Sequence, residues 1–277
     1  MLFNFSKVKM IIRFLINSNI WVSLCALALA LSSEILLQIY NPSISQFVFF
    51  ATLFIYNFQR VVRIKKGNIH ARKNWLNKNR TAVYFLTFFA FIISVVHFFN
   101  FKFSTQVTIF STAILSLMYP FGLRQIPFAK IFVISFVWAI STMLCLVIEN
   151  EIIINQDIIL HLSSRFLFVF AITIPFDIRD IKYDFGKLKT IPLFLGERKS
   201  KWLANFGLLI CVIIAVFQYL QNNIPSSNLL ALFLLYFLAF VLVVKSDKKN
   251  SEMYFSFWIE SLSIFSYLFL VIMLLIV

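Results

Sequence analysis

The sequence has few charged residues and few residues that interrupt helices. Only 13% of its 277 residues are charged, five are Gly and six are Pro, whereas 61% are hydrophobic. The scarcity of Gly and Pro leaves little room for long loops. A soluble core of this size does not need so much apolar surface, so the composition indicates an integral membrane protein whose solvent is lipid.

Cysteine is also scarce, and the three cysteines lie far apart inside apolar runs. Cys25, Cys145 and Cys211 therefore resemble small hydrophobic side chains and predict neither a disulfide nor a metal site. Nothing in the sequence resembles a Ser-His-Asp set, a Cys-rich metal motif or a glycine-rich nucleotide loop. The first apolar run is too long and too weakly bounded for a cleaved signal peptide, so we expect it to be a permanent span.

Apolar segments close to the length of membrane-spanning helices follow one another along the chain. They lie near 19–40, 45–60, 82–100, 105–120, 129–149, 158–176, 200–220, 228–245 and 253–277. In the resulting topology 23 of the 25 Lys and Arg residues fall on one side, and only Lys102 and Arg165 fall on the other. Because cytoplasmic loops collect Lys and Arg, we predict an all-α bundle of nine transmembrane helices with the N-terminus in the cytoplasm and the C-terminus outside. This topology explains the net charge of +14 without a nucleic-acid partner.

The two largest cytoplasmic loops follow the second and the sixth predicted span. This spacing suggests a duplicated unit of four helices in which the second loop of each copy is enlarged. We therefore expect residues 1–277 to form one membrane-embedded domain. In it, helices 1–4 and 5–8 form a pseudo-repeat and a ninth helix follows.

Three carboxylates follow the sixth apolar segment. At about 100° per residue, Asp177, Asp180 and Asp184 fall within roughly 60° of each other on one helix face. Like charges so placed repel, which a chain tolerates where a cation lies between them. Oxygen ligands suit Mg²⁺, which typically takes one or two carboxylates together with phosphate oxygens and water. The alternative is an acidic helix end that is simply solvated.

The residues around these carboxylates extend the pattern, which reads DxxDxxxDxGxxKTxPxxxG and continues through Gly186, Lys189, Thr190, Pro192 and Gly196. This stretch resembles the second aspartate-rich motif of the UbiA family of intramembrane prenyltransferases. The pair Tyr119-Pro120 followed by Arg124 is similar to the Tyr-Pro and basic segment after the fourth helix of that family. The resemblance also agrees with the predicted topology, since the family has nine transmembrane helices and carries this motif at the cytosolic end of the sixth.

The resemblance implies an enzyme that transfers a prenyl group from a prenyl diphosphate to a lipophilic or aromatic acceptor. By position, Asp177, Asp180 and Asp184 would be the catalytic residues and would hold Mg²⁺, and Lys189 would contact diphosphate. Tyr119 and Arg124 would belong to the same substrate-binding set. Such chemistry is reasonable here, because diphosphate leaves readily once cations neutralise its growing charge. We expect the site to face the cytoplasm of a bacterial inner membrane, among membrane lipids and without an obligate protein partner.

The first aspartate-rich motif of the family is not matched. At the end of the second apolar segment only Asn57 agrees, and no Asp or Glu occurs anywhere between Glu34 and Glu149. One hypothesis is that Asn57, Arg60 and Arg63 bind diphosphate oxygens directly, since Arg is a planar donor of several hydrogen bonds. The alternative for the arginines is that they extend to the membrane surface. An alternative function follows as well: a non-catalytic protein of the same fold that binds a polyprenyl lipid or diphosphate.

Two further features allow more than one interpretation. The 36 Phe residues could line a cavity that stabilises a carbocation, or they could reflect a composition biased toward Phe and Ile. Glu260 lies inside the ninth apolar segment, where an acidic residue is either functional or held in a hydrogen bond between helices.

Overall fold

The computed structural model describes residues 5–65, 73–121, 125–184, 186 and 188–276. Within these residues every regular element is a helix. The N-terminal half comprises α1 (Phe5–Asn17), α2 (Ile20–Leu37), α3 (Pro42–Lys65), α4 (Lys73–Lys78), α5 (Arg80–Asn100), α6 (Phe103–Met118) and η1 (Tyr119–Phe121). The C-terminal half comprises α7 (Ala129–Ala139), η3 (Ile140–Leu144), α8 (Cys145–Glu149), α9 (Gln156–Asp184), α10 (Ile191–Leu195), α11 (Glu197–Leu220), α12 (Ser226–Lys245), η4 (Tyr254–Ile259) and α13 (Glu260–Ile276).

Every predicted apolar segment coincides with helix in the described part of the chain. Two of the helices contain a π-helical turn: η3 joins α7 to α8, and η4 leads into α13. Seven helical segments among the described residues are long and apolar enough to cross a membrane. The other two predicted spans correspond to α3, which carries Arg60, Arg63 and Lys65 near its end, and to α6, which has 16 residues. Their crossing of the membrane stays a prediction.

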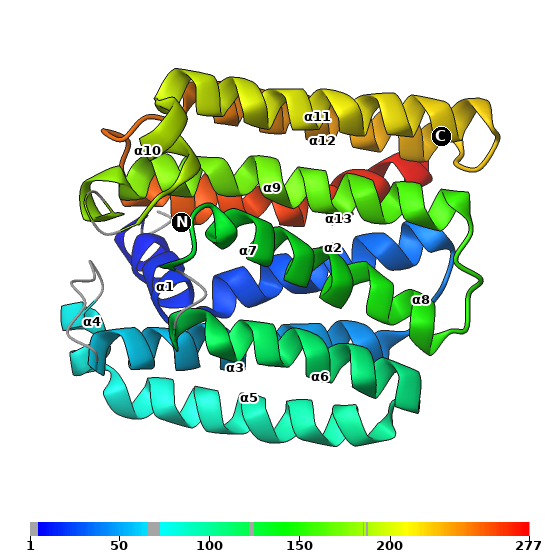
Figure 1. Ribbon diagram of the computed structural model, residues 1–277. Coiled ribbons are helices and arrows are strands. Elements are labelled where there is room, and N and C mark those ends of the chain that lie inside the picture. The colour runs from blue at the N-terminus through cyan, green and yellow to red at the C-terminus, as the bar shows by residue number, and fades with distance from the viewer. Residues whose placement is uncertain (1–4, 66–72, 122–124, 185, 187, 277) are drawn as a thin grey trace.

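The long helices run side by side, and their connections gather at two ends of the molecule (Figure 1). The short helices α1, α4 and α10 lie at one end together with the N-terminus, and the C-terminus lies at the other end. The predicted Asp cluster, at the end of α9, is at the same end as α10. Opposite ends for the two termini fit the predicted topology. Which end faces the cytoplasm stays a prediction.

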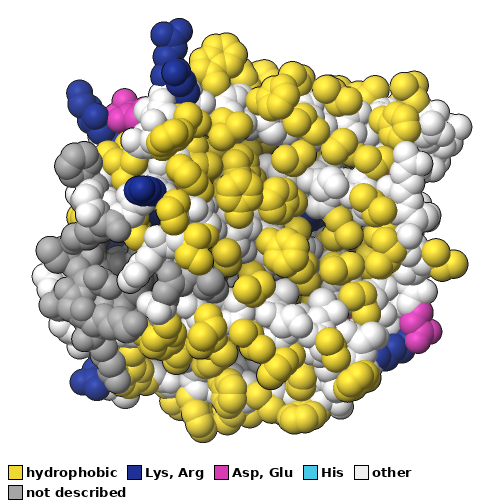
Figure 2. Space-filling view, in the orientation of Figure 1, with side chains coloured by type: hydrophobic (Ala, Val, Ile, Leu, Met, Phe, Trp, Pro, Cys, Tyr) yellow, Lys and Arg dark blue, Asp and Glu magenta, His cyan; other side chains and the backbone are white. Residues whose placement is uncertain are grey.

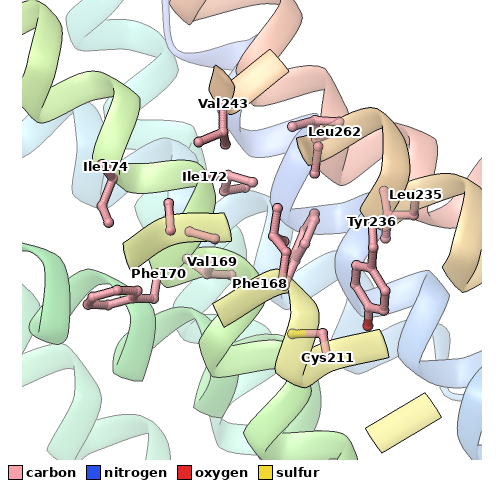
Figure 3. Packing of buried hydrophobic residues seen from close by; sticks show 14 of the residues in the cluster. Phe168, Val169, Phe170, Ile172, Ile174, Cys211, Leu235, Tyr236, Val243 and Leu262 are labelled. Atoms are coloured by element: carbon pink, nitrogen blue, oxygen red, sulfur yellow. The ribbon is translucent and has the colours of Figure 1, made fainter. Parts of the chain in front are cut away.

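Helix α9 is the structural centre of one half of the bundle, where it packs against α7, α11 and α12. Its buried side chains Phe168, Val169, Phe170, Ile172 and Ile174 belong to a single apolar cluster (Figure 3). The neighbouring helices contribute Cys211, Leu235, Tyr236, Val243 and Leu262 to the same cluster. All three cysteines are free and buried, as expected for side chains that pack like small hydrophobic residues. This packing holds the last turns of α9, and hence the carboxylates, in a fixed position.

Helix α2 packs closely against α3 and α13 through small side chains. Its buried positions include Ala26, Ala28, Ala30, Ser32 and Ser33. Small residues let helix backbones approach one another in a membrane, where association depends on close contact because lipid tails are as apolar as the helices.

The outer surface is largely apolar, as expected for a protein bounded by lipid. On the face seen in Figure 2, hydrophobic side chains cover most of the area, and most Lys, Arg, Asp and Glu side chains lie toward its margins. Large exposed side chains such as Phe88, Phe110, Phe206 and Phe237 are each at least 60% accessible. Many of the 36 Phe residues therefore face outward and do not line a cavity.

Candidate active site

The helices enclose an elongated cavity with a volume of about 460 Å³. Its walls are formed mainly by α2, α3, α6, α7, α9 and α13. One end carries charged and polar side chains, namely Arg60, Tyr119, Lys130, Arg179, Asp180 and Asp184. The wall farther along α3, α6 and α8 is formed by Phe47, Ile109, Cys145 and other apolar residues. The cavity thus has a charged region at one end and an apolar region toward the other end.

Two helices line the cavity along much of their length. From α7 to α8 the lining residues recur every three or four positions: Lys130, Val133, Ile134, Val137, Trp138, Ser141 and Cys145. This is the spacing of one helix face, and at 1.5 Å per residue Lys130 and Cys145 are about 22 Å apart along the helix axis. Helix α3 runs along the cavity in the same way from Arg60 to Phe47.

The carboxylates of α9 converge on one ammonium group. Lys130 Nζ lies 2.5 Å from Asp177 Oδ1, 3.5 Å from Asp180 Oδ2 and 3.7 Å from Asp184 Oδ2. These distances confirm that the three carboxylates share one helix face. The side chain of Lys130 is 12% exposed, that of Asp177 1%, that of Asp180 18% and that of Asp184 4%. Asp180 and Asp184 line the cavity, whereas Asp177 lies behind its wall.

Arg179 holds Asp180 from the other side. Its Nε and a terminal nitrogen donate hydrogen bonds of 2.8 and 3.2 Å to the two carboxylate oxygens of Asp180. The guanidinium also lies 5.2 Å from the ring centre of Phe176 and 5.8 Å from that of Phe255, within the range of cation–π contact. Arg179 therefore fixes both the orientation of Asp180 and a positive charge on the cavity wall.

The arrangement bears on the predicted metal site. Within the part of the chain that the structure describes, no three His, Cys, Asp or Glu side chains are positioned to hold a metal ion together. The Lys130 ammonium lies among the three predicted ligands. Asp180 and Asp184, which face the cavity, fit the pattern in which Mg²⁺ uses one or two carboxylates and takes its other ligands from phosphate and water.

On the opposite wall, α3 presents Arg60 to the cavity. Arg60 is 8% exposed and donates a 2.7 Å hydrogen bond to the carbonyl of Asn17. The neighbouring Gln59 also lines the cavity and donates to the carbonyl of Ser116. Arg60 thus lines the same cavity as Asp180 and Asp184, and direct binding of diphosphate by Arg60 stays a prediction.

Asn57 is placed differently. It is fully buried and is not part of the cavity lining. Its Oδ1 accepts a 2.7 Å hydrogen bond from Asn19, and its Nδ2 donates to the carbonyl of Ser18 at 3.1 Å. Both ends of the amide are thus used to hold α3 against the junction between α1 and α2. These contacts make Asn57 a support for the wall that carries Arg60.

Replacing Asn57 by Leu is expected to lower the free energy of unfolding by about 2–4 kcal/mol, because the Asn19 amide and the Ser18 carbonyl lose buried partners. Thermal unfolding in detergent measures the effect, and Asn77→Leu on the exposed face of α4 is the control. Unchanged stability together with weaker diphosphate binding would instead assign Asn57 to the substrate.

The remaining predicted substrate-binding residues have three different outcomes. Tyr119 is 6% exposed and lines the cavity. Lys189 is exposed and is not part of the lining, although its carbonyl accepts a 2.9 Å hydrogen bond from the Phe128 N–H. The side chain of Arg63 and the whole of Arg124 lie outside the described residues, so their predicted roles stay predictions.

Two glycines of the predicted motif have a backbone conformation that explains their presence. Gly186 has φ 73° and Gly196 has φ 79°, in the left-handed region that side chains with a Cβ disfavour. Gly196 directly precedes α11 and lets the chain turn between α10 and α11.

The sequence did not identify Lys130 and Arg179 as residues of the site. In the sequence they are only two of the positive charges that favour the predicted topology. A signal did exist for Lys130, since it lies at the very start of a long apolar segment and is the first Lys or Arg after Arg124. Glu260, by contrast, was considered, and the structure places it on the cavity wall.

Comparison with known proteins agrees with this geometry. The profile of the UbiA prenyltransferase family matches residues 77–262. The chain belongs to the UbiA prenyltransferase family. The match begins after α3, so it leaves out the stretch around Asn57 and Arg60 in which the first aspartate-rich motif is missing. No curated protein sequence shows significant similarity to the chain.

Solved structures share the fold at low sequence identity. The chain is similar to the apo structure of a UbiA homolog from Aeropyrum pernix K1, with 13% identity, a TM-score of 0.64, and coverage of 96% of this chain and 98% of that one. A UbiA homolog from Archaeoglobus fulgidus bound to GPP and Mg²⁺ is similar at 12% identity and a TM-score of 0.63, over 95% and 98% of the two chains. A digeranylgeranylglyceryl phosphate synthase matches at 14% identity and a TM-score of 0.61, over 94% and 96%. Prenyl diphosphate and Mg²⁺ are thus bound together in a member with this fold.

Proposed function

We propose that the protein is an integral membrane prenyltransferase that uses a prenyl diphosphate to alkylate a lipophilic or aromatic acceptor. The observation that carries this proposal is the polarity of the cavity. Charged side chains gather at one end, and apolar side chains line the rest. A prenyl diphosphate has the same division, with a charged head and a long apolar tail. The Mg²⁺-bound and GPP-bound relative supports the same substrate class.

In this function the diphosphate lies between the two walls of the charged end. Arg60 on α3 would donate hydrogen bonds to diphosphate oxygens from one side. Mg²⁺ would be held by Asp180 and Asp184 on the other side and would neutralise charge on the leaving group. Lys130 and Arg179 add fixed positive charge nearby.

The reaction breaks the bond between the first prenyl carbon and the diphosphate oxygen, and the electron pair leaves with diphosphate. Positive charge that is already in place favours this step, because it interacts most strongly with the negative charge that develops on the leaving diphosphate. The prenyl cation then forms a bond to the acceptor, which gives up a proton. Trp138, Phe176 and Tyr56 lie on the cavity wall, and ring faces there can stabilise the cation. The apolar lining excludes water that would otherwise capture it.

The membrane orientation is part of the proposal. The excess of Lys and Arg on the side that carries α4, α10 and the end of α9 supports a cytoplasmic position for the charged end of the cavity. A bacterial inner membrane is the setting we propose. A diphosphate substrate made in the cytoplasm would then reach the site directly, while the acceptor enters from lipid.

The test is the release of diphosphate from prenyl diphosphates by purified protein in nanodiscs, with and without Mg²⁺ and with a panel of aromatic and lipid acceptors. We expect release that depends on Mg²⁺ and increases with a suitable acceptor. Tight binding of the same substrates without release would identify a non-catalytic lipid-binding protein. Absence of both binding and release would contradict the proposed substrate class.

A further inference from the structure

The most unusual feature of the site is the position of Lys130. It is the second residue of α7, and its ammonium lies within 4 Å of a carboxylate oxygen from each of Asp177, Asp180 and Asp184. The contact joins residues that are 47 or more positions apart in the sequence. Lys130 is largely buried, so this is not a flexible surface ion pair.

A backbone contact fixes the start of α7 and hence the position of Lys130. Phe128, the residue before α7, has φ 63° and donates its N–H to the carbonyl of Lys189, which follows the aspartates of α9. The helix therefore begins beside the loop that leaves the Asp cluster. This backbone contact holds the lysine and the carboxylates in register.

Charge explains why a cation is needed there. The carboxylates lie in the last two turns of α9, where the helix dipole itself disfavours negative charge. Buried like charges repel strongly in a low dielectric, and removing the partner of a buried charge leaves it uncompensated. Arg179 contacts Asp180, and Lys130 lies within 4 Å of a carboxylate oxygen of Asp177 and of Asp184.

The wall of the cavity formed by α3 and α6 has no carboxylates. No Asp or Glu exists between residues 35 and 148, so neither α3 nor α6 offers a carboxylate to a metal ion. In place of such a carboxylate, α3 offers the guanidinium of Arg60. Positive charge at this site is therefore supplied in large part by side chains of the protein itself.

We propose that the Lys130 ammonium is a built-in substitute for a divalent cation at the centre of the Asp177, Asp180 and Asp184 cluster. It offsets part of the negative charge of the cluster in the resting protein and excludes a metal ion from its centre. Any Mg²⁺ then enters only with the diphosphate, at the cavity side of Asp180 and Asp184. The last step rests on the proposed function, whereas the exclusion of a resident metal ion does not.

The test counts Mn²⁺ bound to purified protein by electron paramagnetic resonance, with no prenyl diphosphate present. Wild-type protein is expected to bind no Mn²⁺ at the cluster. The variant Lys130→Met keeps an unbranched side chain, one atom shorter than that of Lys, and removes the charge, and it should bind one Mn²⁺ with at least about tenfold higher affinity than wild type. Adding Asp177→Asn to this variant should weaken that binding again.

Two controls distinguish Mn²⁺ binding at the Asp cluster from a general effect of removing positive charge. Lys130→Arg keeps a cation and should bind no more Mn²⁺ than wild type. Lys248→Met removes a positive charge from another cavity-lining residue, whose ion pair is with Glu197, and should also leave Mn²⁺ binding unchanged. Equal Mn²⁺ affinity of wild type and Lys130→Met would overturn the proposal.

Misfolding of the variant is also informative. Recovery of folded Lys130→Met only when Mn²⁺ or Mg²⁺ is present would support the substitution of one cation by the other, whereas misfolding in both conditions would contradict it. The experiment involves no turnover. Failure of wild-type protein to release diphosphate would therefore count against the proposed function alone, and the Mn²⁺ count would still decide the role of Lys130.

Discussion

Replacing Asp184 by Asn is expected to reduce the rate of diphosphate release by about 100-fold or more. The side chain of Asp184 is 4% exposed, lines the cavity and lies 3.7 Å from the Lys130 ammonium. Its loss removes a ligand for Mg²⁺ where charge develops on the leaving group, and single losses of this kind typically reduce rates by about 10²–10³. Release from prenyl diphosphate at saturating Mg²⁺ measures the effect. Glu151→Gln is the control, because this exposed residue lies in the connection before α9.

The neighbouring carboxylate provides a contrast. Asp177→Asn should retain more of the rate than Asp184→Asn, because Asp177 does not line the cavity. It should instead lower thermal stability, since it removes the closest partner of a buried ammonium. Equal losses of rate in the two variants would mean that all three carboxylates hold metal during catalysis, as the family resemblance alone implies.

Replacing Ala51 by Trp is expected to change which prenyl diphosphates the protein accepts. Ala51 lines the cavity on α3, nine residues from Arg60, which corresponds to about 13 Å along the helix. An indole at this depth leaves the charged end intact but blocks the path to Phe47 and Cys145. Long chains should lose at least about tenfold in kcat/KM relative to dimethylallyl diphosphate, because overfilling an apolar site costs about 1–3 kcal/mol and about 1.4 kcal/mol corresponds to a factor of ten.

The control places the same ring on the outside of the bundle. Phe110→Trp lies on α6 and faces outward with 62% exposure, so it should leave the preference among chain lengths unchanged. A uniform loss for all chain lengths in Ala51→Trp would point to disturbed folding. An unchanged preference would show that the prenyl tail leaves the cavity before it reaches α3 at Ala51.

The positions of the helices along the chain were largely predictable because hydrophobicity is a local property. Each predicted apolar segment is helical, and Cys25, Cys145 and Cys211 pack as small apolar residues, as composition indicated. The common face of Asp177, Asp180 and Asp184 was predictable for the same reason, since it follows from helical spacing alone.

The partners of these residues were not predictable, because they come from distant parts of the chain. Nothing in the sequence near Lys130 indicates that its side chain crosses to α9. For Asn57, the sequence suggested a partner, the substrate, that differs from the partners in the structure. Its agreement with a family motif suggested substrate binding, while the structure gives it hydrogen bonds to Asn19 and Ser18 that support the helix junction. Motif position indicated the α3 wall of the cavity, and the structure places Arg60, but not Asn57, in the cavity lining.

The division of the cavity into a charged end and an apolar end also affects how the protein separates what enters from what leaves. In the proposed function a prenyl diphosphate is held at both ends, whereas the alkylated product has lost its diphosphate and is held by apolar contacts alone. Those contacts differ little from the ones that surrounding lipid offers. The product is therefore expected to dissociate readily, whereas free diphosphate still binds at the charged end. Inhibition by accumulated end product is then expected to come from the small water-soluble fragment and not from the lipid.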